Sequence, residues 1–456
     1  MNAVKIRASL TRRVFGRATT VTAGIAISAL ALSALPANAA NDPGVTDTEI
    51  VLGMQLPQDG PASPGYNKVD DAMRAYFDYV NSKGGVYGRK IRLEVQNDEY
   101  KTGKTITTAS YLINKAKIFA FIGSVGTQTH LSVVKDINRR GIPDLFVNSG
   151  YSGLYTTPSK YPTTFGGLGT YVSEAKILGK YMKATFTTEK IGILYQTDDF
   201  GRNTVAGLAS AGYTFEARKT AATFVAGTQK DGLDAQMTQL KDNNVEVVVV
   251  GAVASAYAAA VASANKIGYK PKKWVVISVG SDATTFQTIL YTKGIPLATS
   301  AALLGGTITS SHAPAPADAT DEFVVAFKKI NTDFNKGDKA WDNNVLQGMN
   351  IAYQMTSLLV NVGKTGVTRK NIISYLEKNG SSITGAGFAP LGYSATSHVA
   401  YTGFWVGAYD ATASLKPVGA TRQMWTTDSG TGPVTELTWT RPAIGADSLP
   451  KGFSAK

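Results

Sequence analysis

Apolar and polar positions along this chain predict a repeated order of strands and helices. Short apolar runs, typical of buried strands, are separated by stretches in which apolar residues recur every three or four positions, as on one face of a helix. The first series predicts strands at 50–56, 90–95, 118–123 and 145–147, with helices at 69–80 and around 106–116. A second series predicts strands at 190–196, 245–250 and 274–278, with helices at 171–185, from 201, around 233–240 and at 254–267. Because strands alternate with helices, each series predicts a largely parallel sheet and an α/β fold.

The last third of the chain has a different pattern. Residues 310–320 carry prolines and alanines with no apolar period, which predicts a surface loop. Helical patterns follow at 322–334, 344–362 and 371–378, and short strands are predicted at 401–409, 423–426 and 436–439. We expect the tail from Pro442 to be mobile.

Two strand-to-loop segments indicate where a ligand would bind. Residues 118–127 and 142–152 are apolar runs that each stop in glycine and hydroxyl residues. Glycine lets a ligand approach the backbone, and ligands of open α/β sheets bind at the carboxyl ends of the strands. No nucleophile with an adjacent base is found nearby, so the pattern predicts a protein that holds a small molecule without transforming it.

The first 39 residues have the composition of an export signal. Five basic residues and no acid precede a weakly apolar stretch at 18–35, and Ala37-Asn38-Ala39 supplies a small-residue cleavage pattern. Arg12 and Arg13 resemble the twin-arginine export motif, and the alternative is an ordinary secretory signal. We therefore expect an exported protein, either periplasmic or extracellular at the cell surface.

Composition limits how the exported protein is held together. The chain has no cysteine, which excludes disulfides and a lipid anchor through an amino-terminal cysteine. Without residues 1–39 it is still longer than one hydrophobic core usually supports, so two lobes are expected. The net charge of +13 falls to +8 once the five basic residues of the signal are removed, and the remaining charge is scattered. Scattered charge without a basic patch makes nucleic acid an improbable partner.

Catalytic and metal-binding motifs are missing from the sequence. The three histidines are scattered, and neither metal-ligand spacing nor a nucleophile elbow or phosphate loop is present. Asp198 and Asp199 could be read as a catalytic pair, but adjacent acids are more often turn residues or a helix N-terminus. We expect no enzyme activity, no metal and no cofactor.

Four segments carry a family resemblance. Residues 84–93, 121–127, 142–150 and 195–201 resemble, in this order, motifs of the leucine/isoleucine/valine-binding-protein family, the type I periplasmic solute-binding proteins of ABC importers. The resemblance implies two Rossmann-like lobes joined by three crossovers, with a ligand cleft between them. It places 44–163 and 300–392 in the first lobe, and 164–299 and 393–456 in the second. It also implies an extracellular receptor that acts as a monomer and delivers a small-molecule ligand to an ABC permease.

The same resemblance implies which residues bind the ligand. Receptors of this family grip the ligand carboxylate at positions matching Thr127, Ser149, Gly150 and Tyr151, and place an aromatic residue at the position of Phe200. Each has an alternative role: Thr127 as a helix cap, Ser149 and Gly150 as a turn, and Phe200 as plain core.

Two departures from the family pattern concern the ligand's ammonium group. Val253 stands where amino-acid receptors place a second aromatic residue. The loop containing Gly280 lacks their carboxylate unless Asp282 supplies it, and Asp282 is better interpreted as a helix N-cap. A buried ammonium without a carboxylate is costly, so we expect a carboxylate ligand with an apolar or aromatic body. Tyr66 and Tyr100 are candidates for the pocket wall or are surface tyrosines. The alternatives are a receptor for branched-chain amino acids or amides, and a ligand sensor of the same fold that feeds a signalling partner.

Overall fold

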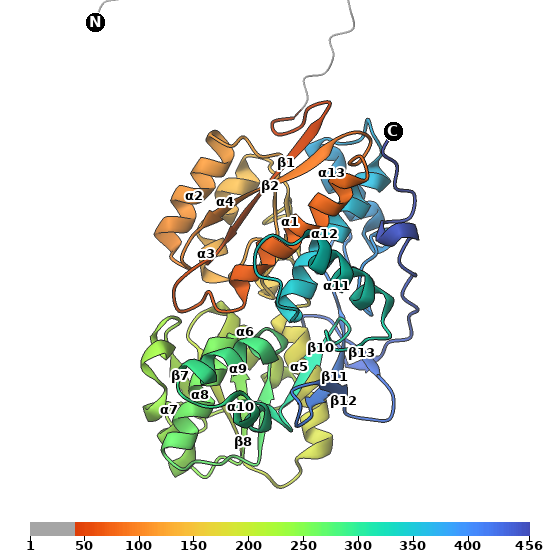
Figure 1. The fold of residues 1–456 in the computed structure, drawn as a ribbon. Coiled ribbons are helices and arrows are strands. Elements are labelled where there is room, and N and C mark those ends of the chain that lie inside the picture. Colours follow the sequence, from red (N-terminus) through yellow and green to blue (C-terminus); the bar gives the residue numbers. More distant parts are fainter. Residues whose placement is uncertain (1–41) are drawn as a thin grey trace, which may run out of the picture. The chain divides into compact units, whose positions relative to one another are not determined.

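A computed structural model describes residues 42–456 as two α/β lobes (Figure 1). The predicted signal peptide, residues 1–39, lies outside the described residues. The first lobe has a parallel sheet in the order β2-β1-β3-β4-β5. Its strands are β1 Glu49–Leu56, β2 Lys90–Asn97, β3 Ala120–Ile122, β4 Asp144–Val147 and β5 Thr164–Gly166.

Helices from two distant parts of the chain pack on this sheet. The early ones are α1 Val69–Ser82, α2 Thr102–Asn114, α3 Gln128–Leu131 and α4 Val134–Arg139; the later ones are α11 Glu322–Phe334, α12 Asn343–Val362 and α13 Arg369–Asn379. In α1 the apolar stripe of Met73, Tyr76 and Phe77 is buried, and it packs against α11 and α12. Burial of this stripe stabilises the helix, and Asp70 and Asp71 in its first turn interact favourably with the helix dipole.

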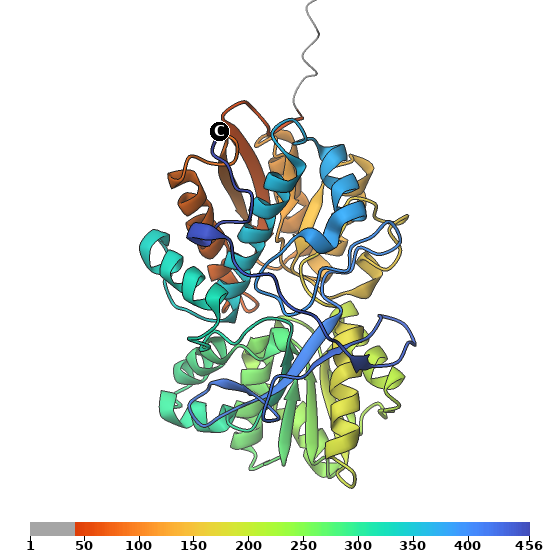
Figure 2. The same cartoon turned by 90° about the vertical axis from the view of Figure 1, so that its right-hand side faces the viewer.

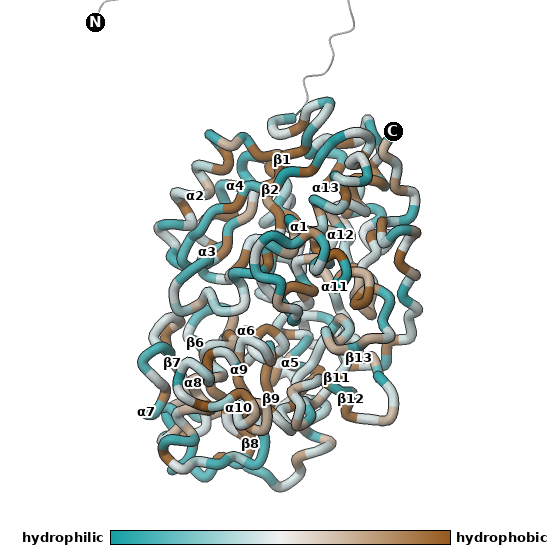
Figure 3. Tube along the Cα trace, viewed as in Figure 1, coloured by the Kyte–Doolittle hydropathy of each residue, from teal (hydrophilic) through white to brown (hydrophobic). Residues whose placement is uncertain are grey.

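The second lobe has a mixed sheet in the order β14-β13-β11-β10-β9-β8-β6-β7, with β12 paired to β11. The strands from β7 to β10 are parallel, whereas β11 to β14 are antiparallel to their neighbours. The strands are β6 Ile191–Gln196, β7 Ala221–Phe224, β8 Val247–Gly251, β9 Lys273–Val276, β10 Ile308–Ser311, β11 Gly403–Tyr409, β12 Leu415–Pro417, β13 Met424–Thr426 and β14 Thr435–Glu436. The helices are α5 Tyr171–Thr185, α6 Asp199–Ser210, α7 Asp234–Asp242, α8 Ala254–Lys266, α9 Ala283–Thr292 and α10 Leu297–Leu304. Hydrophobic residues concentrate along the central strands, and β8 is buried over its whole length (Figure 3).

The α/β fold with two lobes is confirmed, but strand pairing moves the expected lobe boundaries. Residues 164–166 form β5 in the first sheet, and 308–311 form β10 in the second. Residues 391–401 still contribute to the first hydrophobic core through Leu391, Tyr393 and Tyr401. The breaks expected at 163, 299 and 392 are therefore each displaced, because hydrogen bonds to neighbouring strands, which composition does not reveal, decide where a short strand belongs.

The segment 310–320 is the expected surface loop only in its later part, where Ala317, Ala319 and Thr320 are exposed. Its first part is the end of β10, and Ser310 and His312 are both buried. These residues belong to the crossover from the second sheet to α11. Pro314 and Ala315 are buried at this crossover, whereas Ala317 and Ala319 are exposed to solvent.

The prediction of a mobile C-terminal tail is wrong. Residues 437–456, here called the C-terminal strap, run from β14 back to the first lobe (Figure 2). There Leu449 is buried in the first core, and the Tyr76 hydroxyl donates a 2.9 Å hydrogen bond to the Ser448 carbonyl. Arg441 forms a 2.7 Å ion pair with Asp321, which caps α11. The strap is a fourth passage between the lobes, beyond the three crossovers expected. Across residues 42–456, no helix is long and apolar enough to cross a membrane.

Candidate ligand-binding site

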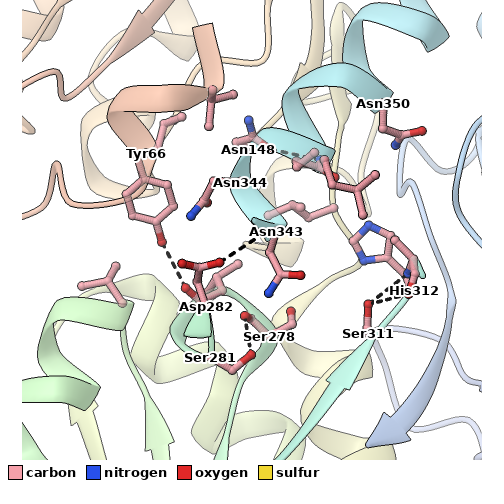
Figure 4. Close-up of a pocket in the computed structure, with 18 of the residues that line it drawn as sticks. Tyr66, Asn148, Ser278, Ser281, Asp282, Ser311, His312, Asn343, Asn344 and Asn350 are labelled. Atoms are coloured by element: carbon pink, nitrogen blue, oxygen red, sulfur yellow. Dashed lines mark hydrogen bonds between the residues drawn. The ribbon is translucent and has the colours of Figure 1, made fainter. Parts of the chain in front are cut away.

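A cavity lies between the two lobes, where the carboxyl ends of their strands meet (Figure 4). The first lobe contributes Tyr66, Tyr100, Thr127 and the first turns of α12, and the second lobe contributes Phe200, Val253 and the loop after β9. The space open to the centre of a water molecule is about 110 Å³. One water needs roughly 10–15 Å³ on this measure, so the cavity holds several waters or a small organic molecule.

The predicted site residues divide into two groups. Five line the cavity: Tyr66, Tyr100, Thr127, Phe200 and Val253. Four are not among the lining residues: Ser149, Gly150, Tyr151 and Gly280. The predicted loops therefore border the cavity, but Ser149, Gly150 and Gly280 are not among the residues that line it.

Tyr171 is the reason that the Ser149–Gly150 turn is covered. A Cβ on Gly150 would come within 2.6 Å of the Tyr171 ring, so this ring lies directly on the glycine. Next to it the Thr127 and Ser149 hydroxyls are buried and 2.7 Å apart. Sequence reasoning missed Tyr171, although it lies two residues after the glycine-containing segment 166–169 at the first crossover.

The Tyr171 hydroxyl is an uncharged donor at neutral pH. Burial raises the pKa of Tyr171 to about 12, and hydrogen bonds involving the Gly150 backbone and the Thr127 side chain partly offset this rise. The helix that we expected to begin at Thr127 is broken into α3, only four residues long, and α4. A helix dipole therefore contributes little at Thr127, and hydroxyl groups are the main donors at this end of the cavity.

Phe200 is both core and cavity wall. It stacks on Tyr171 with ring centroids 4.1 Å apart, and it is only 2% exposed. Asp198 places it by capping α6: its carboxylate accepts hydrogen bonds from the backbone N–H groups of Phe200 and Gly201. This confirms the interpretation of Asp198 as a helix N-terminus. Together the rings of Tyr66, Tyr100, Tyr171 and Phe200 form what we call the aromatic wall.

Asp282 is a helix cap, as predicted, and it also joins the lobes. Its Oδ1 accepts a 2.7 Å hydrogen bond from the Thr285 N–H at the start of α9. Its Oδ2 accepts a 3.2 Å hydrogen bond from the Asn343 N–H at the start of α12, in the other lobe. Each oxygen of this carboxylate thus already accepts one backbone hydrogen bond.

Glu174 in α5 supports the floor of the cavity. One of its oxygens accepts hydrogen bonds of 2.6 Å from both the Ser278 N–H and the Ser310 hydroxyl, and these two serines line the cavity. Burial raises the pKa of Glu174 to about 7. No sequence signal marked Glu174, because its burial depends on packing between α5 and the second sheet.

His312, at the end of β10, lines another part of the cavity. Its ring stacks on Tyr401 with centroids 4.3 Å apart, and burial lowers the pKa of His312 to about 4. Among residues 42–456, no group of three or more histidine, aspartate or glutamate side chains is placed to hold a metal ion.

Comparison with known proteins agrees with this architecture. The family model described as "Periplasmic binding protein" matches residues 49–414, about four fifths of the chain. The chain belongs to this family. Among curated relatives, this periplasmic binding protein is 23% identical over 210 residues to the Leu/Ile/Val-binding protein BraC3 of Rhizobium johnstonii. That match covers 44% of this chain and 54% of the relative, so it spans about half of the relative's length.

Two solved structures share the fold at low sequence identity. A branched chain amino acid ABC transporter protein from Thermus thermophilus, with bound valine, superposes with a TM-score of 0.70 at 16% identity, covering 84% of this chain and 98% of that one. A fatty acid ABC transporter substrate-binding protein from Thermomonospora curvata also gives 0.70, at 17% identity, covering 85% and 95%. At these identities the similarity shows the fold alone.

Proposed function

We propose that this protein is the extracellular solute-binding receptor of an ABC importer, which captures a small organic ligand and delivers it to a membrane permease. The observation that carries the proposal is a cavity walled by strand-end loops of both lobes. Relatives named as Leu/Ile/Val-binding proteins and as ABC transporter substrate-binding proteins support the same role.

The ligand that fits this cavity best is a carboxylate with an apolar or aromatic body. The aromatic wall offers flat apolar surface to such a body. The Thr127 and Tyr171 hydroxyls lie beside this wall and would donate hydrogen bonds to the carboxylate. No lysine or arginine of residues 42–456 lines the cavity, so uncharged donors would have to serve an anion.

An α-amino acid fits less well, because its ammonium group would have to share its carboxylate partner with backbone donors. Asp282 is the one carboxylate lining the cavity within the described chain, and both its oxygens already accept backbone hydrogen bonds. Pairing Asp282 with an ammonium would compete with the bond to Asn343 that joins the lobes. Solved structures of this fold are named for both kinds of ligand, valine in one and fatty acid in another. The lining of this chain favours the acid without an ammonium.

Ligand binding would favour the closed arrangement of the lobes. Polar contacts between the lobes include the 3.3 Å hydrogen bond from the Tyr66 hydroxyl to the Val279 carbonyl. The backbone N–H and the hydroxyl of Ser152 also donate hydrogen bonds to the Asn203 side-chain carbonyl, at 3.0 and 2.8 Å. A ligand that touches both lobes adds contacts available only when they are closed, and so shifts the population toward that state.

Native mass spectrometry of the purified mature protein would identify any retained ligand, and calorimetry would then measure its binding. We expect an acid without an ammonium to bind, leucine to bind poorly, and small-angle scattering to show compaction with the bound acid. Tight leucine binding would contradict the ligand class. Saturable binding without compaction would contradict the closing mechanism.

A further inference from the structure

His312 is held rigidly against the cavity by the two later crossovers. Its carbonyl accepts a 2.7 Å hydrogen bond from the Phe388 N–H, which fixes the backbone. Its ring lies on the Tyr401 ring, at an interplanar angle of 20°. The Tyr401 hydroxyl in turn accepts hydrogen bonds from Asn350 and Gln354, at 3.2 and 2.7 Å. The imidazole is therefore positioned before any ligand arrives.

One nitrogen of this imidazole lacks a partner. The Nε2 atom of His312 is buried and has no partner in hydrogen-bonding geometry within the part of the chain that the structure describes, although the Gln347 side chain lies close enough to affect the pKa of the imidazole. An unpaired buried polar atom is destabilising, so the imidazole keeps a hydrogen-bonding group that a ligand or a water molecule can satisfy. Figure 4 shows His312 at one side of the cavity and Asn344 of α12 at the opposite side near Tyr66, with Asn343 between them.

The groups around His312 are uncharged. They are the rings of Tyr401 and Phe404 and the Gln347 side chain, so nothing in direct contact would stabilise an imidazolium. A neutral imidazole offers one donor and one acceptor. It suits a hydroxyl, carbonyl or amide group better than a second carboxylate, which can only accept.

We propose that His312 determines ligand specificity by hydrogen bonding to an uncharged polar group of the ligand, at the end remote from its carboxylate. The inference rests on the receptor function proposed above and narrows its substrate class. The ligand has an apolar or aromatic body with an acid at the aromatic wall and a hydroxyl, carbonyl or amide at His312. A water molecule at the imidazole is the alternative partner.

Two matched pairs of probes test this inference by calorimetry. Phenylacetate and para-hydroxyphenylacetate differ only in the remote hydroxyl, and phenylethanol and para-hydroxyphenylethanol repeat the comparison without a carboxylate. In the wild type we expect the hydroxyl to increase affinity about three- to tenfold, the value of one net hydrogen bond. His312→Phe keeps a ring that can stack on Tyr401 and should reduce this ratio to about one. His312→Gln keeps a donor and an acceptor and should restore part of it. Thermal unfolding of both variants verifies that they fold.

The outcomes separate this inference from the receptor proposal. The inference is wrong if the acids bind but the hydroxyl does not increase affinity, or if the increase in affinity persists in His312→Phe. In that case a water molecule is the hydrogen-bond partner of the imidazole, and the receptor proposal stands. If only the alcohols bind, with a gain that depends on His312, the inference stands and the carboxylate assignment fails. If none of the four compounds binds at millimolar concentration, both the carboxylate assignment and the role of His312 are wrong.

Discussion

Replacement of Glu174 by glutamine tests whether a buried acid supports the floor of the cavity. Glu174 is 1% exposed, and one of its oxygens accepts both the Ser278 N–H and the Ser310 hydroxyl. A glutamine carbonyl can accept the same two hydrogen bonds, so the loop after β9 should keep its place. What changes is that residue 174 no longer titrates.

The magnitude follows from the pKa of Glu174, which burial raises from 4.5 to about 7. Between these two pH values the folded protein binds a proton that the unfolded chain has released, so the free energy of unfolding falls as the pH rises. This contribution is fully present below pH 4.5 and is lost above pH 7. At about 1.4 kcal/mol for each pH unit between the two pKa values, the loss is about 3 kcal/mol.

Urea unfolding of wild type and Glu174→Gln from about pH 4.5 to about pH 8 measures this term. We expect the stability of the wild type relative to the variant to fall by about 3 kcal/mol over this range. Other acids titrate in both proteins and cancel in the difference. Glu436→Gln, at an exposed glutamate of β14, is the matched control and should run parallel to the wild type. If the Glu174→Gln curve is also parallel to the wild type, the pKa of Glu174 is not raised and the reasoning fails.

Three further predictions concern binding, the strap and export. Thr127→Val should weaken binding of an identified carboxylate ligand ten- to hundredfold by calorimetry, the loss of about 1.5–3 kcal/mol expected for a hydrogen bond to a charged group; unchanged affinity would place the carboxylate elsewhere. Arg441→Ala should lower the unfolding temperature, because it leaves the buried Asp321 without its ion-pair partner, whereas Lys451→Ala, at an exposed strap residue, should leave the unfolding temperature unchanged. Equal effects of the two substitutions would contradict a specific anchor at Arg441. Replacing Arg12 and Arg13 together by lysine should block export if the signal is of the twin-arginine type, and secretion of the double variant at the normal level would exclude that route.

The binding site shows how far the sequence could reach. Thr127, Phe200, Tyr66 and Tyr100 were proposed because they follow strands, and the carboxyl ends of parallel strands meet at one edge of a sheet; the structure places all four at the cavity. Tyr171 was missed because a helical pattern does not show what the first residue of the helix contacts, and His312 because it lies on a crossover, where no periodic pattern marks a residue's neighbours. Glu174 was missed for a related reason: a glutamate in a helix looks solvent-exposed until packing buries it.

The sequence by itself determined the α/β class, the two series of strands and helices, and the Asp198 and Asp282 caps, because each of these depends on residues close together in the chain. Only the tertiary structure decided which sheet receives β5 and β10, how the strap returns to the first lobe, and which side chains face the cavity. These depend on hydrogen bonds and contacts between residues far apart in the chain, such as Asp282 with Asn343, or Arg441 with Asp321. Helix and strand propensities reflect residues that are neighbours in sequence, whereas a binding site is formed by segments that are neighbours only in space.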